Sequence, residues 1–495
     1  MDRDKRHKKV VRQRILAFII TIVVLAGLTT GAVIGIKYLV DSGFIARMMP
    51  EKKEPVTVEA TEEPSESDSW IAVEREKIVD DYADVDTSVL SENETEEEPK
   101  EEILESDEEI ESIIGNLDIE EKVAQLFIVT PEEITGVDIA TRAGNSTKDA
   151  LTLYPVGGLI YFSQNFENMD QTVEMLSKSS EYIKDACGIA PFMGVDEEGG
   201  RVVRVADNEA FAPKEEEGAK DKDSKASEKK DKEEAGETES DTEEPSANSI
   251  PEIKNVGSMG DIGKAKDMDG AYNAGSETGA YLSAIGFNLN FAPDADVLSD
   301  KGNEVIGDRS FGSDPNLVAK LSWQYASGLK EAGVTPCFKH FPGHGSVAGD
   351  THEGPVSQDA TLEELYASDL IPFQNAADNE ADMIMASHIS CPEVTGDDMP
   401  ASLSHRMLTE ILRGEMGFKG VIITDSFEMG AVTQKYPDPG EAAVNAVKAG
   451  ADMILMPSDF HEAYNGLLSA VSSGDIDEGR IDDSLRRILK VKLGR

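Results

Sequence analysis

Eight short apolar runs constrain the fold of this chain more than any other feature of its sequence. Each run is hydrophobic over about four to eight residues, a pattern typical of parallel strands that are covered on both faces. The runs are VAQLFIVT from Val123, VGGLIYF from Val156, APFMGVD from Ala190, GFNLNFAPDADV from Gly286, TPCFKHF from Thr335, ADMIMASHIS from Ala381, GVIITDS from Gly420 and ADMILMPS from Ala451.

Amphipathic segments separate these runs. Residues 168–186, NMDQTVEMLSKSSEYIKDA, and residues 314–333, DPNLVAKLSWQYASGLKEAG, have the pattern of helices, and the second segment ends at Gly333, which suits a C-cap. Strands that are each followed by a helix, eight times over, predict an α/β fold, the (β/α)8 barrel of the TIM type. A doubly wound open sheet is the alternative.

The amino-terminal region has the composition of a membrane anchor. Residues 1–14, MDRDKRHKKVVRQR, are strongly basic, and an almost uncharged run, ILAFIITIVVLAGLTTGAVIGI, extends from Ile15 to Ile36. A helix needs about twenty apolar residues to cross a hydrocarbon core of roughly 30 Å. We therefore expect a transmembrane helix at residues 15–37, with the basic head in the cytoplasm and the rest of the chain on the other side of the cell membrane. A cleaved signal peptide, which would make the protein secreted, is the alternative.

Two stretches have a composition that is unsuited to a packed core. Residues 38–103 are rich in Glu, Asp, Ser, Thr and Pro, and we expect them to form a disordered acidic linker. Residues 213–248 contain no large apolar residue, which predicts a disordered insertion, or a charged single helix, within a catalytic domain at residues 104–495. About 350 residues of ordinary globular sequence remain, which is enough for one large core.

The charge balance and the cysteine content exclude two classes of protein. The chain has 47 Lys+Arg against 97 Asp+Glu, a formal net charge of −50, which argues against binding to nucleic-acid phosphates. Its three cysteines, Cys187, Cys337 and Cys391, are too few for a disulfide-rich scaffold, and their spacing matches no zinc knuckle.

Polar residues directly follow several of the apolar runs, as catalytic residues do at the carboxyl ends of barrel strands. They occur at Asp196-Glu-Glu-Gly-Gly-Arg, Lys339-His340, Ser387-His388 and Thr424-Asp425-Ser426. This part of the chain also contains four of the seven histidines, namely His340, His344, His352 and His388. We therefore expect one catalytic site at this end of the barrel.

The fifth run leads into a long loop, KHFPGHGSVAGDTHEGP, whose glycines and prolines argue against a helix. Asp350 and His352 lie two residues apart in this loop, so the carboxylate can accept a hydrogen bond from one imidazole nitrogen. Such a pair leaves the other nitrogen free for proton transfer. Asp425 ends the seventh run and is a second candidate catalytic group, with a helix N-cap as the alternative role.

Four motifs resemble those of the β-N-acetylhexosaminidases of glycoside hydrolase family 3. They are the K-H-F-P-G-H-G of residues 339–345, the D-T-H of residues 350–352, D-E-E-G-G-R from Asp196 and G-V-I-I-T-D from Gly420. The resemblance extends from about Leu117 to the carboxyl terminus, with the charged insertion as an interruption. The first motif is highly specific. The family's usual D-S-H reads D-T-H here, which keeps both functional side chains.

The resemblance implies a retaining β-N-acetylhexosaminidase that acts on terminal β-N-acetylglucosaminides of cell-wall or other glycan fragments, with no cofactor and no metal. The family's aspartate nucleophile matches Asp425, its histidine acid/base matches His352, and the carboxylate that orients this histidine matches Asp350. Its sugar-binding positions match Asp196, Arg204, Arg309, Lys339 and His340. Some relatives take a glutamate acid/base from a second domain. Since this sequence ends at Arg495, soon after the last predicted helix, we expect His352 to serve instead.

Other interpretations remain open. Another family 3 β-glycosidase, or a β-glycoside phosphorylase, would use the same residues, and a non-catalytic cell-wall binding protein would use none of them for chemistry. A metal-dependent barrel hydrolase would take zinc ligands from His340, His344, Asp350, His352 and His388, although Lys339 would repel the cation. The arginines and Lys339 would otherwise form an ion-pair network, and we expect His344 to brace the loop.

Overall fold

A computed structural model describes residues 100–212 and 250–494 of the chain. The predicted basic head, the transmembrane segment at 15–37, the linker up to residue 99 and the insertion at 213–248 lie outside the described residues. Within the described ranges, no helix combines the length and the apolar character that crossing a lipid bilayer requires.

Eight parallel strands form a closed barrel, which confirms the TIM-type prediction over the open sheet. Strand β1 pairs with β10 through Phe127 and Ile454, and this pairing closes the ring. Every barrel strand lies within one of the eight apolar runs. The barrel strands are β1 (Phe127–Val129), β2 (Gly158–Ile160), β3 (Phe192–Val195), β4 (Leu289–Asn290), β5 (Thr335–Phe341), β7 (Met383–Ala386), β9 (Val421–Ser426) and β10 (Met453–Leu455).

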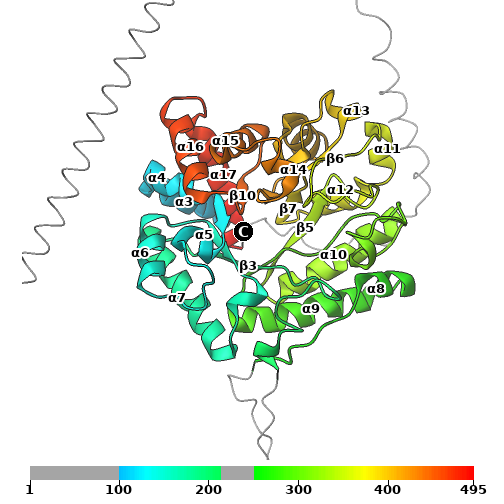
Figure 1. Ribbon diagram of the computed structural model, residues 1–495, viewed down its shortest axis with the longest axis horizontal. Coiled ribbons are helices and arrows are strands. Elements are labelled where there is room, and N and C mark those ends of the chain that lie inside the picture. Colours follow the sequence, from blue (N-terminus) through cyan, green and yellow to red (C-terminus); the bar gives the residue numbers. More distant parts are fainter. Residues whose placement is uncertain (1–99, 213–249, 495) are drawn as a thin grey trace, which may run out of the picture. The chain divides into compact units, whose positions relative to one another are not determined.

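Helices surround the strands, which lie at the centre of the view in Figure 1. The α-helices are α3 (Lys100–Asn116), α4 (Ile119–Ala124), α5 (Pro131–Thr135), α6 (Asn145–Leu153), α7 (Met169–Cys187), α8 (Met259–Ala265), α9 (Met268–Ile285), α10 (Pro315–Glu331), α11 (Leu362–Ala367), α12 (Ile371–Asp378), α13 (Pro392–Thr395), α14 (Gly430–Thr433), α15 (Pro439–Ala449), α16 (Phe460–Ser472) and α17 (Glu478–Lys492). Shorter helical segments are η3 (Ser163–Asn165), η4 (Glu209–Phe211), η5 (Gly307–Arg309) and η6 (Ala401–Leu403), and η7 (Arg406–Glu415) is a π-helix.

The two helices expected from their amphipathic pattern are present as α7 and α10. Asn168 caps the start of α7, where its side chain accepts a hydrogen bond from the backbone N–H of Gln171. At the end of α10, Gly333 adopts a left-handed conformation with φ of 83°. The N–H groups of Gly333 and Val334 donate hydrogen bonds to the carbonyls of Lys330 and Leu329. These two carbonyls would otherwise have no hydrogen-bond partner within the helix.

Two further strands, which the sequence analysis did not anticipate, lie in the segments that follow β5 and β7. Strand β6 (Val356–Ser357) pairs in parallel with β8 (Ile389–Ser390). Strand β6 comes directly after the loop that carries Asp350 and His352. The pairing therefore ties this loop to the segment that leaves the neighbouring barrel strand.

Candidate active site

A cavity of about 450 Å³ lies at the carboxyl ends of the barrel strands. Seven of the eight side chains predicted to form the site line this cavity. The eighth, Asp350, does not line it but is bonded to His352, which does. The seven are Asp196, Arg204, Arg309, Lys339, His340, His352 and Asp425. Glu198, Ser426 and Glu428 also line the cavity, and the other lining side chains are apolar, namely Ile160, Phe162, Val202, Met385, Met429, Leu455 and Met456.

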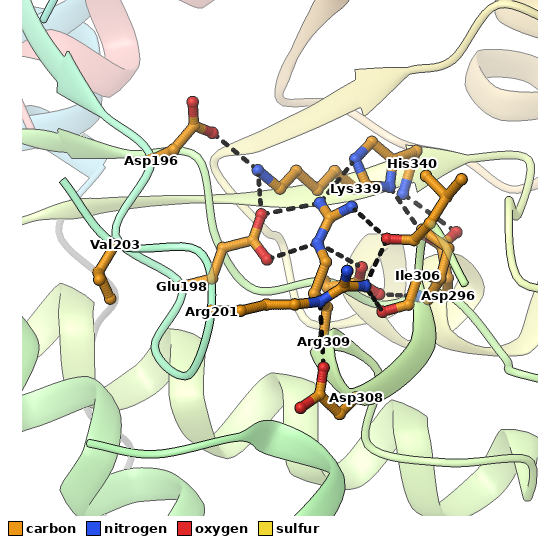
Figure 2. A network of polar contacts seen from close by, with 12 residues as sticks. Asp196, Glu198, Arg201, Val203, Asp296, Ile306, Asp308, Arg309, Lys339 and His340 are labelled. Atoms are coloured by element: carbon orange, nitrogen blue, oxygen red, sulfur yellow. Dashed lines mark hydrogen bonds and ion pairs between the residues drawn. The ribbon is translucent and has the colours of Figure 1, made fainter. Parts of the chain in front are cut away.

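Lys339 and Arg309 share one carboxylate, that of Glu198. Lys339 Nζ lies 2.9 Å from Asp196 Oδ1 and 2.6 Å from Glu198 Oε1, so the ammonium joins the two carboxylates (Figure 2). Arg309 donates to both oxygens of Glu198, from Nε and Nη2, each at 2.8 Å. Although burial opposes ionisation, these two cations hold the pKa of Glu198 well below its usual value. This wall of the cavity is therefore a preorganised array of charged groups.

Arg204 and Asp196 are held by the loop that follows β3. Arg204 Nη2 lies 3.7 Å from Asp196 Oδ2, and the guanidinium lies over the ring of Phe162, 5.7 Å from its centroid. The buried carboxylate of Glu197 fixes this loop because it accepts hydrogen bonds from the backbone N–H groups of Arg204, Val205 and Ala206 at 2.6–2.9 Å. In the sequence Asp196-Glu197-Glu198, the outer two carboxylates thus line the cavity, while the middle one shapes the backbone.

Lys339 and His340 are consecutive, yet both line the cavity. The register between β5 and β7 shifts between Phe338 and Phe341, and such an irregularity changes the direction in which side chains point. His340 Nδ1 donates to Asp296 Oδ2 at 2.6 Å, and Arg309 Nη2 lies 3.3 Å from His340 Nε2. Both ring nitrogens are therefore engaged, which fixes the orientation of the imidazole.

The predicted pair of Asp350 and His352 is formed. His352 Nδ1 lies 2.7 Å from Asp350 Oδ1, and the same oxygen accepts from the backbone N–H of His352 at 2.9 Å. Burial opposes ionisation of Asp350, but these contacts with His352 lower the pKa of the carboxyl. The side chain of His352 is 68% exposed, so its other nitrogen can reach a group that enters the cavity.

The loop around His352 is anchored to the turn that follows β9. The backbone N–H groups of Gly430 and Ala431 donate to the carbonyls of His352 and Thr351, each at 3.1 Å. A Cβ atom at Gly430 would lie 2.7 Å from the His352 carbonyl oxygen, so only glycine allows this close approach. The two candidate catalytic groups, on β9 and on the loop after β5, are joined by this direct backbone contact.

Asp425 lies near the end of β9, and its carboxylate lines the cavity without an ion-pair partner among the described residues. Its Oδ1 accepts a hydrogen bond from the N–H of Ser426 at 2.8 Å. Burial raises the pKa of Asp425, but His340, His388 and Lys339 outweigh that effect and lower it overall. The alternative role as an N-cap does not fit, because Met429 precedes α14. The surroundings of Asp425 thus favour its charged form, and no cation among the described residues pairs with it.

His388 supports the backbone beside Asp425. It is fully buried, and its Nε2 lies 2.8 Å from the Ser426 carbonyl while its Nδ1 lies 2.8 Å from Ser402 Oγ. Burial lowers the pKa of His388, which favours the neutral ring. His344 has a bracing position of the kind expected from the sequence, with Nε2 3.4 Å from the hydroxyl of Thr351.

The geometry does not gather the five residues weighed as zinc ligands into one group. Among the described residues, the cluster with atoms close enough to hold a cation is Asp294, Asp296 and His340. His340 Nδ1 is bonded to Asp296 within this cluster, and Arg309 Nε lies 3.6 Å from Asp294 Oδ2. A cation bound there would lie against a fixed guanidinium, so these residues do not fit a metal ion.

Several residues that build the site were not identified from the sequence. Glu198 is enclosed in a motif that was noted, and Asp296 follows the fourth apolar run, where a carboxylate at the end of a strand was the available signal. Arg201 donates to the carbonyls of Glu304, Val305 and Ile306 at 2.7–2.9 Å and so holds the turn that carries Arg309 (Figure 2). Nothing in the sequence indicates those backbone contacts.

Comparisons with known proteins show which family and which solved structures this chain is similar to. The family model described as the glycosyl hydrolase family 3 N terminal domain matches residues 118–239 and 238–491. The β-hexosaminidase of Idiomarina loihiensis is 33% identical over 341 residues, which cover 68% of this chain and 84% of that relative.

β-Hexosaminidase A of Pseudoalteromonas piscicida is 28% identical over 368 residues, which cover 70% of this chain. The match covers 54% of that relative, so this chain spans about half of its length. The solved structure of a glycoside hydrolase family 3 β-N-acetylglucosaminidase from a Paenibacillus species aligns with a TM-score of 0.63 and 31% identity. That alignment covers 76% of this chain and 63% of the Paenibacillus chain.

Proposed function

Because the chain belongs to glycosyl hydrolase family 3 and is a glycoside hydrolase, we propose that it is a retaining β-N-acetylhexosaminidase that releases terminal β-linked N-acetylglucosamine from glycan fragments. The observation that carries this proposal is the composition of one cavity. An ionised, unpaired Asp425 and a His352 that is oriented by Asp350 line it together with the ion-paired group of Asp196 and Lys339.

The two catalytic groups have separate tasks in this reaction. Asp425 attacks the anomeric carbon and forms a glycosyl-enzyme intermediate, while His352 gives a proton to the departing oxygen. His352 then removes a proton from the incoming water, which attacks the intermediate and restores Asp425 with net retention of the β configuration. Asp350 accepts the hydrogen bond from Nδ1, so that the other nitrogen of His352 serves the proton transfers.

The charged wall binds the sugar that Asp425 attacks. Asp196 accepts hydrogen bonds from sugar hydroxyls, and Arg204 and Lys339 donate them. Arg309 and His340 hold these groups in place through Glu198 and Asp296. Because the ion pairs exist before substrate arrives, little reorganisation accompanies binding.

We further propose that the catalytic domain is attached to the outer side of the cell membrane by the helix expected at residues 15–37. The basic head and the long apolar run support this arrangement.

The proposed activity is tested with the purified protein on 4-nitrophenyl β-N-acetylglucosaminide and 4-nitrophenyl β-glucoside, with and without phosphate and EDTA. We expect the first substrate to be hydrolysed with much higher kcat/KM, and neither addition to be required. Asp425→Ala should lose the activity while it keeps the wild-type melting curve. A preference for the glucoside, or sugar phosphate as the main product, would contradict the proposal, as would one tenth of wild-type activity in the variant.

A further inference from the structure

One acidic side chain in the cavity lining has no lysine or arginine to pair with, although two histidines also line the cavity. Three carboxylates, Asp196, Glu198 and Asp425, face three cations, Arg204, Arg309 and Lys339. Glu428 adds a fourth carboxylate to this lining. In the part of the chain that the structure describes, its side chain makes no hydrogen bond or ion pair, and only its backbone N–H has a contact, with Ser426 Oγ at 3.3 Å. Glu428 therefore contributes a negative charge that no lysine or arginine of the lining pairs with.

Glu428 lies at the exposed rim of the cavity. His352 is exposed as well and lines the same cavity, and two residues after Glu428 the N–H of Gly430 donates to the carbonyl of His352 at 3.1 Å. By contrast, the side chain of Lys339 is only 4% exposed, so the charged group proposed to bind the attacked sugar lies at the buried end of the cavity. A leaving sugar that extends from the buried end toward the rim would thus pass both the proposed proton donor and Glu428.

Although Glu428 is exposed, the protein shields part of its carboxyl group from water. Burial raises the pKa of Glu428. Burial also raises the pKa of Glu133, after β1, to about 8, and the charge of Glu428 adds to that shift. Met429 and Met456 line the cavity beside it and provide no compensating charge. A second negative charge that entered this space would consequently be repelled.

We propose that Glu428 makes the enzyme discriminate against substrates whose leaving sugar carries a negative charge, in favour of glycans whose leaving sugar is neutral or bears an amine. This inference rests on the proposed function, since it concerns the leaving side of the same site. If the charge of Glu428 and a negative charge on the leaving sugar are about 7 Å apart, at an effective dielectric constant of about 40, their repulsion lowers kcat/KM by a factor of about 5 to 10. Salt should reduce this factor, because the rim is exposed.

The test uses three disaccharides in which β-1,4-linked N-acetylglucosamine is the sugar to be released. The leaving sugar is N-acetylglucosamine itself, the same sugar with a 3-O-lactyl carboxylate, or the same sugar with the corresponding neutral lactyl amide. The amide reproduces the shape of the carboxylate without its charge. We measure kcat/KM for wild type, Glu428→Gln and Glu353→Gln, at low and at high salt.

For wild type at low salt, we expect kcat/KM to be about 5- to 10-fold higher for the lactyl amide than for the carboxylate. Glu428→Gln should bring this ratio close to one. Glu353→Gln removes an equal charge beside His352 from a side chain that does not line the cavity, so it should keep the ratio of wild type.

Two kinds of failure can be distinguished. If the ratio of amide to carboxylate is the same in wild type and in Glu428→Gln, the role of Glu428 is wrong while the proposed function stands. If wild type hydrolyses none of the three disaccharides, including the unmodified one, the proposed function itself fails.

Discussion

At the scale of single residues, the site depends on carboxylates that have similar chemistry but different surroundings. Asp425 is ionised and unpaired among the described residues, Asp350 is bonded to an imidazole, and Glu198 is neutralised by two cations. Their positions in the sequence do not separate these roles, since each stands in a loop or at the end of a strand. The distinction comes from the neighbours that the fold supplies.

Asp350 is expected to act through the orientation of His352. Asp350→Asn keeps a hydrogen-bonding group beside Nδ1 but removes the charge that favours a protonated ring, so the rate should fall by roughly 10²- to 10⁴-fold. The loss should be larger for substrates with poor leaving groups, which need protonation most. Steady-state rates over a series of aryl β-N-acetylglucosaminides measure this dependence. An equal loss for all leaving groups would indicate that Asp350 only supports the loop.

Glu133, on α5, is a carboxyl group whose electrostatic cost can be measured through stability. Burial raises the pKa of this carboxyl to about 8, and its Oε1 atom has no partner among the described residues. Because this value lies above the unfolded value of about 4.3, the folded state binds more protons between the two, and stability is lost as pH rises from about 4 to about 8.

We therefore expect Glu133→Gln to raise the melting temperature at pH 8 and to raise it much less at pH 5. Thermal denaturation of both proteins across this range gives the comparison. A lower melting temperature in the variant at every pH would mean that the hydrogen bond from the Thr130 N–H to the carboxylate matters more than the cost of its charge.

At the scale of elements, the position of His352 depends on how its loop docks against the start of α14. Gly430→Ala places a Cβ atom 2.7 Å from the His352 carbonyl oxygen, so the loop must move. We expect kcat to fall by at least about 10-fold, since a displacement of about 1 Å in catalytic geometry costs on the order of 10²-fold. Gly115→Ala is the matched control, because an added Cβ there meets no atom within 4 Å. Wild-type kcat in Gly430→Ala would show that this contact does not position His352.

Most of the fold could be predicted from the sequence, because a parallel strand that is covered on both faces leaves a continuous apolar run. All eight barrel strands and the ends of α7 and α10 follow from such local patterns. The pairing of β6 with β8 could not be predicted, since strands of two residues carry almost no pattern.

The candidate site was predictable where side chains occur in a specific motif, as at Lys339 and His352. It was not predictable where the role depends on contacts between distant segments. Arg201 and Arg204 illustrate the difference, since they lie three residues apart near one motif. Arg201 holds the backbone before Arg309, whereas Arg204 lines the cavity. The two roles differ because the fold places the backbone carbonyls around residue 305 next to Arg201 and not next to Arg204.

At the scale of the whole molecule, the membrane anchor remains a proposal about residues 15–37, outside the described part of the chain. The basic head and the apolar run predict that the amino terminus stays in the cytoplasm. Protease added to intact cells should then release an active fragment that contains the barrel. Recovery of the full-length chain from the soluble cytoplasmic fraction would contradict the anchor, but it would leave the catalytic account unaffected.

The central claim is that Asp425 and His352 act as nucleophile and acid/base, and the reaction of His352→Ala with azide tests it most directly. Without the base, the glycosyl-enzyme formed from an activated aryl substrate should accumulate, because water is no longer deprotonated. Azide needs no deprotonation, so it should restore turnover and yield a glycosyl azide with retained β configuration. If azide restores no activity, all substrates are impaired equally and EDTA inactivates the wild-type enzyme, His352 is a metal ligand and the account is wrong.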